Sequence, residues 1–357
     1  MATEGSSARI SWGILGCGKI SNDFANAIHQ AKGCDLVTVG ARNVDSAEAF
    51  GKLHGAKRWG NYDAVVSDAE VQIIYVGSIH PYHYKLVLSA LEAGKHVLVE
   101  KPMGMNAREC KEMAAKAKEK GLFLMEGVWT RCFPATRKVV EILSSGALGD
   151  VVQFVGDLGF DIPFEVDRLY DLNLGGGGLL DLGIYPLSWL LLAFAGKDLK
   201  GLSASARLHK GGADMSGVIT AKFGDEGIGA CMYSTRSLTQ NEVEICCREG
   251  RIRVGGPESG FASAHTPERI EIWTAGDQLL KGQKKEVLTF PVPKFKTTKS
   301  PMNFPNSEGF LYEVEHVAEC LRQNLKESPN WTLAETIQCA EIMDEVRKQV
   351  GVKYPTD

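Results

Sequence analysis

The chain has 357 residues, 44% of them hydrophobic, and its 40 Lys and Arg against 44 Asp and Glu give a formal net charge of −4. This length exceeds that of one average domain and therefore predicts two. The balanced charge excludes the strongly basic surface of a nucleic-acid-binding protein and the acidic excess of a disordered chain. We therefore expect small molecules or another protein chain as partners.

The sequence predicts a cytoplasmic protein that neither crosses nor binds a membrane. Its most apolar run, residues 189–195, is far shorter than the roughly 20 residues that a bilayer requires, and residues 1–9 lack the order of a secretory signal. The nine cysteines are scattered, odd in number and without a C-x-x-C pair. We interpret them as mostly buried free thiols in a reducing compartment.

The first half of the chain alternates short apolar runs with stretches of helical length, which is typical of successive βαβ units. The predicted strands are residues 10–15, 36–41, 71–76, 96–99 and 122–126. One helix is expected over residues 107–119. This half, residues 8–127, is predicted to be an α/β domain with a doubly wound parallel sheet.

The second half, residues 128–357, is predicted to be an α+β domain with a large, mostly antiparallel sheet. Its strands are expected at residues 151–158, 202–208, 217–223, 228–236, 242–247, 251–254, 269–273 and 286–290, and its helices at 134–146, 179–194, 308–325 and 332–350. Because helices on one face leave the other face of such a sheet open, we expect a homodimer through this sheet.

A glycine motif directly follows the first predicted strand. It reads Gly16-Cys17-Gly18-Lys19-Ile20-Ser21. Gly16 would permit a tight turn, and Gly18 would let backbone amides approach a pyrophosphate at the positive end of the next helix. The alternative is an ordinary strand-to-helix turn. At the first βα junction of a parallel sheet, the motif indicates a dinucleotide-binding Rossmann domain, with residues 16–20 on the cofactor.

The end of the second strand carries Arg42 where an NAD-binding domain usually carries an acidic residue. A guanidinium can bind a 2′-phosphate through two hydrogen bonds. We therefore expect NADP. In the alternative interpretation Arg42 is merely solvated and Asp45 or Glu48 binds the ribose of NAD.

The third strand leads into Ser78, His80 and His83. Ligands of such folds lie beyond the carboxyl ends of the strands, so these residues are expected to line the nicotinamide site. The H-x-x-H spacing lacks the further Cys, Asp or Glu that a metal site requires, so no metal is predicted.

Three motifs together resemble the glucose-fructose oxidoreductase/inositol dehydrogenase (Gfo/Idh/MocA) superfamily. They are the glycine motif, Glu100-Lys101-Pro102 and the stretch from Gly175 through Asp181 to Tyr185. Within it, residues 123–131 and 327–355 are most similar to the dimeric dihydrodiol dehydrogenases and the NADP-dependent D-xylose 1-dehydrogenases. The resemblance spans the chain from Trp12 onward.

The resemblance implies that Lys101, Tyr185 and Asp181 are catalytic. Tyr185 would take the proton of the substrate hydroxyl, and Lys101 would lower the phenol pKa from its usual value near 10. Asp181 would orient substrate hydroxyls or adjust that pair; its alternative role is to cap the helix. A cis bond before Pro102 would aim Lys101 inward.

Further residues are assigned to the cofactor and the substrate by the same resemblance. Glu100, Lys101, Trp129 and Arg131 are expected on the cofactor. Trp129, Phe160, Arg168, Asp181 and Tyr185 are expected on the substrate, most of them in or near the irregular stretch 159–178. Residues 292–305 are either a lid or a solvated connection, and the connection is favoured.

The expected function is NADP-dependent oxidation of one hydroxyl of a cyclic vicinal diol, either C1 of a D-xylose-type aldose or a trans-1,2-dihydrodiol. Two alternatives remain open. One is an NADPH-dependent reductase of a sugar or dicarbonyl compound. The other is a non-catalytic dinucleotide-sensing regulator similar to the galactose-regulon repressor, which would not need the Lys101 and Tyr185 pair.

Overall fold

The computed structural model describes residues 9–256, 263–274 and 282–357, which form two compact units. The first unit consists of Met1–Gly104, Arg108–Gly127 and Val292–Thr336. The second consists of Met105–Ala107, Val128–Pro291 and Ile337–Asp357. Both units are therefore assembled from separate stretches of chain.

This division differs from the predicted domains 8–127 and 128–357 in its C-terminal part. The break between Gly127 and Val128 is present, but Val292–Thr336 belongs to the first unit. The reason is the packing of α9 (Phe310–Arg322) against α1 (Lys19–Gln30), a contact between segments almost 300 residues apart. A single linear boundary does not describe such a chain.

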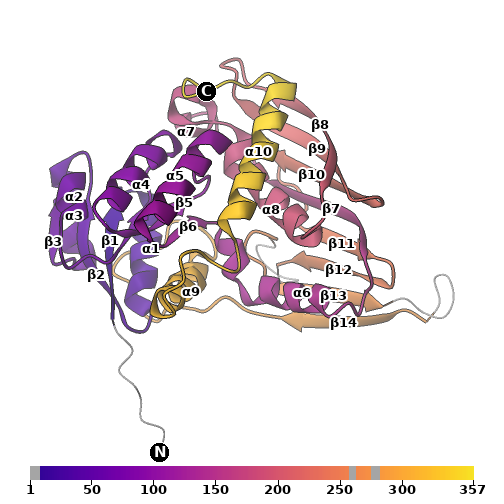
Figure 1. Cartoon of the computed structure of the whole chain (residues 1–357), viewed down its shortest axis with the longest axis horizontal. Helices are drawn as coiled ribbons and strands as arrows, with labels where there is room; N and C mark the ends of the chain where they lie inside the picture. Colours follow the sequence, from indigo (N-terminus) through magenta and orange to yellow (C-terminus); the bar gives the residue numbers. More distant parts are fainter. Residues whose placement is uncertain (1–8, 257–262, 275–281) are drawn as a thin grey trace, which may run out of the picture. The chain divides into compact units, whose positions relative to one another are not determined.

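The first unit is built on a six-stranded sheet in which every pairing is parallel, with the order β3-β2-β1-β4-β5-β6. The strands are β1 (Ile10–Leu15), β2 (Cys34–Gly40), β3 (Arg58–Gly60), β4 (Ile73–Val76), β5 (His96–Glu100) and β6 (Leu124–Gly127). The other helices are α2 (Val44–His54), α3 (Tyr62–Val66), η1 (His80–Tyr82), α4 (His83–Glu92), α5 (Ala107–Lys120) and η5 (Ser307–Gly309). The predicted doubly wound sheet is confirmed, and only the short edge strand β3 escaped prediction (Figure 1).

Aromatic side chains join α1 and α9 to the sheet. The rings of Phe24 and Tyr75 stack with centroids 3.7 Å apart. Trp12 and Phe310 meet Phe24 edge-on at 5.4 and 5.6 Å. All four side chains are essentially buried, so they hold the late helix α9 in the core of the first unit.

The segment 292–305, predicted as a solvated connection, is mostly exposed, and it is also hydrogen-bonded to α1. Asp23, which is fully buried, accepts hydrogen bonds from the backbone N–H groups of Asn303 and Phe304 at 2.8 and 3.0 Å. Asn26 donates to the Ser300 carbonyl at 3.1 Å and accepts from the Lys299 N–H at 2.9 Å. Asp23 and Asn26 of α1 thus bind the backbone of this segment.

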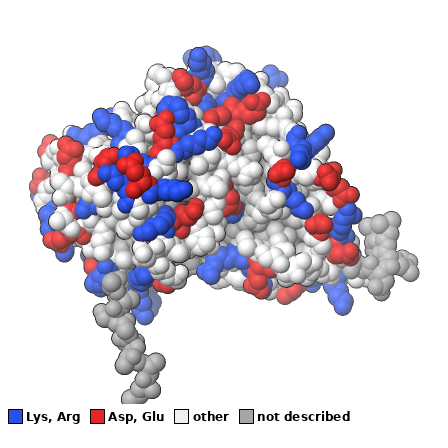
Figure 2. Space-filling model, in the orientation of Figure 1, with Lys and Arg blue, Asp and Glu red and all other residues white. Residues whose placement is uncertain are grey.

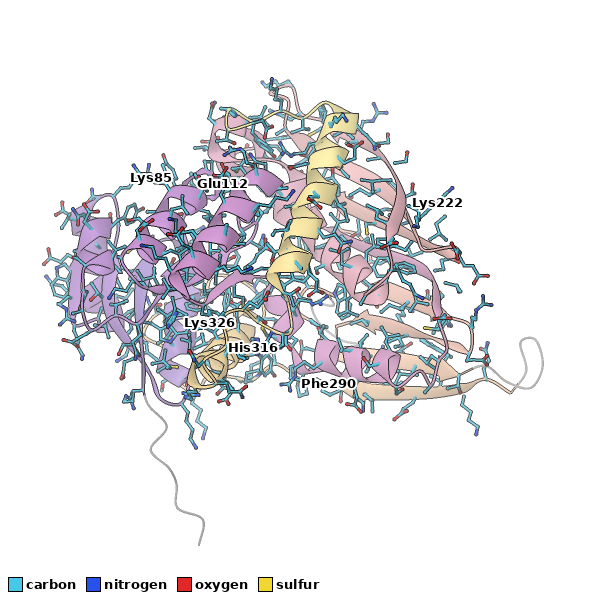
Figure 3. All side chains as sticks on the ribbon, in the orientation of Figure 1. Lys85, Glu112, Lys222, Phe290, His316 and Lys326 are labelled. Carbon is cyan, nitrogen blue, oxygen red and sulfur yellow. The ribbon has the colours of Figure 1, made fainter. Side chains whose placement is uncertain are left out.

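A second tie holds α9 to the turn that precedes α10 (Leu333–Val350). His316, labelled in Figure 3, bonds through Nε2 to the hydroxyl of Ser328 at 2.8 Å. That hydroxyl also accepts from the N–H of Asn330 at 3.0 Å. The buried Ser328 therefore closes the turn that the Ser-Pro-Asn sequence predicts.

The second unit contains an eight-stranded sheet with the order β14-β13-β12-β11-β7-β10-β9-β8. Its strands are β7 (Val151–Gly159), β8 (Leu199–Leu208), β9 (Asp214–Phe223), β10 (Gly227–Ser234), β11 (Val243–Cys247), β12 (Gly250–Gly255), β13 (Arg269–Thr274) and β14 (Lys284–Thr289). β7 and β10 pair in parallel and the other pairs are antiparallel, which confirms the predicted α+β architecture.

The helices of the second unit are η2 (Trp129–Cys132), α6 (Pro134–Ser144), α7 (Asp167–Tyr170), η3 (Leu172–Leu174), the π-helical turn η4 (Leu179–Gly183), α8 (Ile184–Ala193) and most of α10. One of them, α8, is apolar on all sides. α8 packs on β7 and β10 with every residue buried. By length and composition, the helical stretch Leu172–Ala193 would suffice to cross a membrane, and its apolar window is entirely buried, as in the core helix of a soluble protein.

Charges on the surface are mixed in sign. On the face drawn in Figure 2, Lys and Arg side chains alternate with Asp and Glu.

All nine cysteines are free thiols, and only Cys17 and Cys246 are partly exposed.

Candidate functional site

The glycine loop of the first unit has the geometry of an anion site. Gly16 has φ +100°, and a Cβ at this position would come within 2.9 Å of the Gly77 carbonyl oxygen, so only glycine fits. A Cβ on Gly18 would meet no atom within 4 Å. Gly16 is therefore packed against neighbouring backbone, whereas the space beside Gly18 is unoccupied by protein atoms.

The start of α1 is ready for a negatively charged group. Gly18 is the N-cap and has no side chain to bond the first amides, and the first turn carries no acidic residue. Unpaired N–H groups at a helix N-terminus favour anions. Lys19 is exposed there and Ile20 is half-buried. This geometry suits the pyrophosphate of a dinucleotide, and the contact of residues 16–20 with the cofactor stays a prediction.

Cys17 contributes bulk to this loop and no charge. Burial raises the pKa of its thiol to about 12, and the Sγ–H group donates to the Gly40 carbonyl at 3.7 Å. The thiol is therefore protonated at neutral pH and links the glycine loop to the end of β2.

Arg42 lies just beyond β2, with its guanidinium over the ring of Tyr82. The guanidinium carbon is 5.0 Å from the ring centroid, and Nη1 donates to the Tyr82 hydroxyl at 3.1 Å. Of the acidic alternatives, Glu48 forms an ion pair with Lys52 at 2.6 Å and Asp45 is exposed in the first turn of α2. A held, exposed cation at this strand end suits a phosphate group.

His83 supports two loops, and its predicted place beside the nicotinamide stays a prediction. It is fully buried, and its Nδ1 and Nε2 lie 2.8 and 2.9 Å from the carbonyl oxygens of Pro102 and Ser78. Burial, and more weakly the charge of Lys101, lower the pKa of His83. The ring therefore joins the loop after β4 to the loop after β5. His80 is nearly buried beside it, with ring centroids 5.9 Å apart.

Glu100 fixes the backbone that carries Lys101. Its Oε1 accepts from the Tyr75 hydroxyl at 2.7 Å and its Oε2 from the Lys101 N–H at 3.2 Å. The Lys101–Pro102 bond is cis, and the Lys101 side chain is half-buried. Glu100 therefore acts through the backbone of its neighbour, whereas the sequence placed it on the cofactor.

Two further buried carboxyl groups lie near this strand end, and the sequence did not single them out. Glu126 accepts from the Met103 N–H and the Trp331 indole N–H, both at 2.8 Å. Glu313 of α9 is fully buried, and neither of its oxygens has a hydrogen-bond partner within the described ranges. Burial and the charge of Glu100 raise the pKa of Glu313 well above its usual value, which favours the protonated form.

In the second unit, the glycine run explains how the helix that carries Asp181 and Tyr185 begins. Gly177 has φ +142°, and a Cβ there would lie 2.5 Å from Oδ1 of Asp214 and 2.7 Å from the Tyr354 hydroxyl. The other oxygen of Asp214 accepts from the Leu179 N–H at 2.6 Å. Asp214 thus caps the helix, which was one of the roles considered for Asp181.

Asp181 forms an ion pair with Arg168, a residue that the sequence assigned to the substrate. Nη1 and Nη2 of Arg168 donate to the two carboxylate oxygens at 3.0 and 3.5 Å. The Asp181 side chain is 8% exposed and that of Arg168 is 42% exposed. The charges of Asp181 and, more weakly, Tyr185 raise the pKa of Arg168, so this cation lies within electrostatic reach of the phenol.

Three aromatic side chains, one of them Tyr185, contact the ring of His265. Trp129 and Phe160, both predicted substrate contacts, lie with ring centroids 5.9 Å from the ring of His265. His265 in turn meets Tyr185 at 5.3 Å, edge to face. Sequence analysis missed His265, because its loop carries no motif and its partners are distant in sequence.

Arg131 holds the helix that carries Tyr185. Its Nη1 donates to the Ser188 carbonyl at 3.0 Å, and the Ser188 hydroxyl donates to the Tyr185 carbonyl at 2.7 Å. Arg131 is 7% exposed. Its predicted role on the cofactor stays a prediction, and the structure adds a supporting role.

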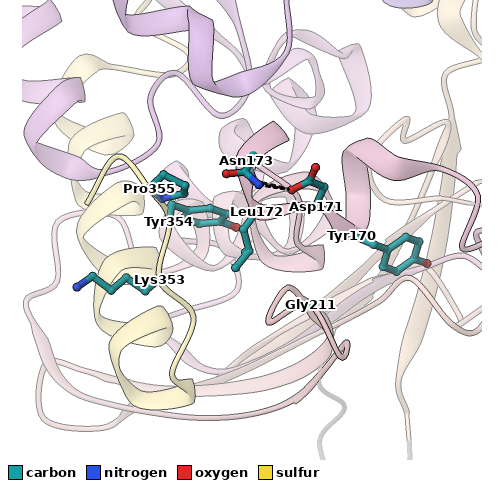
Figure 4. A pocket seen from close by; sticks show the side chains of 8 residues that line it. All are labelled: Tyr170, Asp171, Leu172, Asn173, Gly211, Lys353, Tyr354 and Pro355. Carbon is teal, nitrogen blue, oxygen red and sulfur yellow. Dashed lines mark hydrogen bonds between the residues drawn. The ribbon is translucent and has the colours of Figure 1, made fainter.

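The second unit also has a pocket of about 600 Å³ beside the glycine run (Figure 4). Its lining is Tyr170, Asp171, Leu172, Asn173, Gly211, Lys353, Tyr354 and Pro355. Tyr354 donates from its hydroxyl to the Gly176 carbonyl at 2.7 Å. None of the predicted site residues lines this pocket.

The structure groups the predicted residues into two sets. Gly16 to Ile20, Arg42, Ser78, His80, His83, Glu100 and Lys101 lie in the first unit, and Trp129, Arg131, Phe160, Arg168, Asp181 and Tyr185 in the second. Since Lys101 and Tyr185 belong to different units, their pairing stays a prediction. Within the described residues, no group of three or more His, Cys, Asp or Glu side chains could hold a metal ion.

Comparison with known proteins agrees with this arrangement. Residues 10–128 match the family described as "Oxidoreductase family, NAD-binding Rossmann fold", and residues 136–253 match the "GFO/IDH/MocA C-terminal domain". Proteins named trans-1,2-dihydrobenzene-1,2-diol dehydrogenase from Mus musculus and Danio rerio are 36% and 37% identical over 98% of this chain and 99% of theirs.

Solved structures show the same fold at lower identity. The 3-ketoreductase KijD10 from Actinomadura kijaniata, in complex with NADP, superposes with a TM-score of 0.78 at 23% identity, covering 97% of this chain and 99% of its own. An aldose-aldose oxidoreductase from Caulobacter crescentus gives 0.78 at 20% identity over 96% and 98%. The family matches, the two-unit fold and the full-length relatives together show that the chain belongs to the GFO/IDH/MocA family of oxidoreductases.

Proposed function

We propose that the protein is an NADP-dependent dehydrogenase that oxidises one hydroxyl of a cyclic vicinal diol, either a trans-1,2-dihydrodiol or C1 of a D-xylose-type aldose. The observation that carries this proposal is the constellation of the second unit. There Asp181 forms an ion pair with Arg168, and the rings of Trp129, Phe160 and Tyr185 each contact His265. Such a surface offers polar groups for hydroxyls and flat walls for a ring.

In this reaction Tyr185 takes the hydroxyl proton while the C–H bond of the same carbon breaks. NADP, when bound, supplies the nicotinamide carbon that accepts the hydride. The phenolate form that a base requires is favoured by nearby cations. Arg168 is one such cation, and we assign Lys101 as the second. Asp181, held by Arg168, orients the substrate.

Tyr185→Phe tests the proposed base. The variant should lose about 100-fold or more in turnover and keep its NADP affinity, because only the proton acceptor is removed. Tyr84→Phe is the matched control, since Tyr84 is an exposed phenol that bonds to Glu112. Unchanged turnover in Tyr185→Phe would refute the assignment. Lys101→Met, measured in the same way, tests the second cation.

Arg42 supports NADP over NAD. Arg42→Ala should weaken NADP binding by about 10-fold or more and change NAD binding little, because only NADP carries the 2′-phosphate. Arg108→Ala, at an exposed arginine of α5, controls for the change in net charge. Equal weakening of both cofactors would favour the alternative in which Asp45 or Glu48 binds the ribose.

The substrate and the direction of reaction are decided by one assay. Pentoses, hexoses and trans-dihydrodiols are assayed with NADP. Sugars and dicarbonyl compounds are assayed with NADPH. In both assays the absorbance of the reduced cofactor is followed. Faster NADPH consumption than formation would favour a reductase. Tight dinucleotide binding without turnover of any compound would indicate a sensing regulator.

We also propose that the outer face of the large sheet binds a second copy of the chain. Met232 of β10 lies opposite Val218 of β9, and Ala230 lies opposite Val155 of β7. Val155, Val218, Ile228 and Met232 are between 38% and 46% exposed. Lys222, labelled in Figure 3, flanks this apolar patch opposite Ile228. A contiguous apolar patch on a sheet is typical of a subunit interface.

Light scattering tests this homodimer. Met232→Asp should give a monomer, and Leu53→Asp, at an even more exposed position of α2, should not. A wild-type monomer at micromolar concentration would refute the interface. Apart from a second copy of the chain, we propose small-molecule substrates as the only partners, and neither nucleic acid nor a membrane. We also propose a cytoplasmic location, which the nine free thiols support.

A further inference from the structure

We propose that His265 binds the second, non-reacting hydroxyl of the diol and thereby selects vicinal diols over simple alcohols. This inference rests on the proposed function, because it concerns the same site. It assigns a hydrogen-bonding role to a residue that belongs to no recognised motif.

The position of the ring is the first support. The imidazole of His265 contacts the rings of Trp129, Phe160 and Tyr185, with centroids 5.9, 5.9 and 5.3 Å away. These three come from η2, from the segment after β7 and from α8. His265 is therefore the residue at which the aromatic walls and the proposed base converge.

The backbone around His265 is held rigidly. The Ala264 N–H donates to the Asn241 carbonyl at 2.7 Å, and the Trp189 indole N–H donates to the Ala264 carbonyl at 2.8 Å. The Thr130 hydroxyl donates to the carbonyl of His265 itself. Since Trp189 lies one helical turn beyond Tyr185 on α8, the same helix positions both rings. A site held in this way is pre-organised for a ligand.

The accessibility of His265 differs from that of its neighbours. Ser263, Ala264, Thr266 and Pro267 are all buried, whereas His265 is partly exposed. Its loop is thus anchored in the core and presents this one polar side chain outward. A polar residue on an otherwise buried segment is expected to meet solvent or a ligand.

Ser263 fixes the orientation of the imidazole. Its fully buried hydroxyl bonds to Nδ1 of His265. A neutral imidazole carries one donor and one acceptor nitrogen, and the bond at Nδ1 fixes the orientation of the ring. We assign Nε2 to the substrate hydroxyl. A vicinal diol places its second hydroxyl on the adjacent carbon, so a group beside Tyr185 is suitably located to bind it.

The test compares a diol with the alcohol that lacks the second hydroxyl. The pairs are D-xylose against 2-deoxy-D-xylose, and trans-cyclohexane-1,2-diol against cyclohexanol, each with NADP. His265→Phe keeps the aromatic packing and removes the hydrogen bond. It should lower kcat/KM on the diol by about 10- to 100-fold and change kcat/KM on the simple alcohol by less than about 3-fold.

Two conservative variants separate a hydrogen bond from a structural effect. The amide nitrogen of His265→Gln can occupy the place of Nε2, so this variant should recover most of the preference for the diol. His265→Asn reaches only the place of Nδ1 and should not recover it. Thermal denaturation and NADP affinity of all variants are measured beside the wild type. Should His265→Phe not fold, the contrast between Gln and Asn decides.

The outcomes distinguish this inference from the proposed function. If the wild type turns over no alcohol, the proposed function is wrong. If the wild type oxidises diols and every His265 variant keeps the same diol-to-alcohol ratio, the role of His265 is wrong and the dehydrogenase remains. Equal losses on both members of a pair would likewise overturn the assignment.

Discussion

The backbone N–H of Leu179 donates to Asp214 at 2.6 Å, which joins the first residue of β9 to the start of the helix bearing Asp181 and Tyr185. Asp214 is fully buried, and burial raises the pKa of its carboxyl. The helix that carries the proposed base is therefore capped from the sheet, by a residue 35 positions away.

Replacing this cap should loosen the helix start. Asp214→Ala leaves the Leu179 N–H buried without an acceptor and should cost about 1 to 3 kcal/mol of unfolding free energy. Asp214→Asn keeps an oxygen for the same N–H and should lose less than half as much. Denaturant unfolding measures both. Equal losses in the two variants would show that the hydrogen bond is not what stabilises the helix.

The two glycines of the dinucleotide loop should respond in opposite ways. Gly18→Ala places a methyl group where no protein atom lies within 4 Å, so the fold should be unaffected while NADP affinity falls by about 10-fold or more. Gly16→Ala forces a side chain into φ +100° against a carbonyl and should destabilise the fold by about 1 to 3 kcal/mol. Thermal denaturation and fluorescence titration with NADP separate the two effects. Full NADP affinity in Gly18→Ala would contradict the proposed approach of the pyrophosphate.

Glu313 should make stability depend on pH. Its folded pKa is raised well above that of the unfolded chain, near 4.3, so the folded state keeps a proton that the unfolded state has released. This contribution is present at low pH and is lost as pH rises, by up to about 1.4 kcal/mol for each pH unit between the two pKa values. Glu313→Gln removes this loss.

The measurement is urea unfolding at pH 5 and pH 8. The variant should gain stability relative to the wild type as pH rises, whereas Glu319→Gln, at an exposed position of the same helix, should not. A difference between Glu313→Gln and wild type that is constant with pH would show that Glu313 is ionised in the folded protein.

Asp23 should be needed to keep the segment 292–307 on α1. Asp23→Ala removes the acceptor for the N–H groups of Asn303 and Phe304 and for the Ser307 hydroxyl. We expect a loss of about 3 kcal/mol or more, and faster tryptic cleavage after Lys296 and Lys299. The exposed Asp45→Ala is the control. Unchanged cleavage would mean that other contacts hold the segment.

Local patterns predicted the strands and the glycine loop correctly. Apolar runs identify strands, and the restriction at Gly16 is a property of the turn itself. His265 and Asp214 escaped notice because their roles depend on partners far away in the chain, such as Thr130, which is 135 residues from His265. The periodic pattern of apolar residues in a sequence does not indicate contacts between residues so far apart in the chain.

Some side chains have roles that the sequence pattern does not reveal. His83 has the position of a site residue, and its two ring nitrogens lie against two carbonyl groups. Asn26 and Asp23 bind a segment that lies 273 to 280 residues later. In each case the burial of the side chain decides its role, and a single sequence does not reveal that burial.

The interleaving of the two units has a consequence for synthesis. Phe310, which covers Phe24, leaves the ribosome after more than four-fifths of the chain has been translated. Until then the nascent nucleotide-binding unit presents the apolar side of α1 to solvent, a state that favours aggregation or chaperone binding. A truncated gene ending at codon 127 would leave that surface permanently uncovered, so expression of this unit alone would require residues 292–336 to be supplied by fusion.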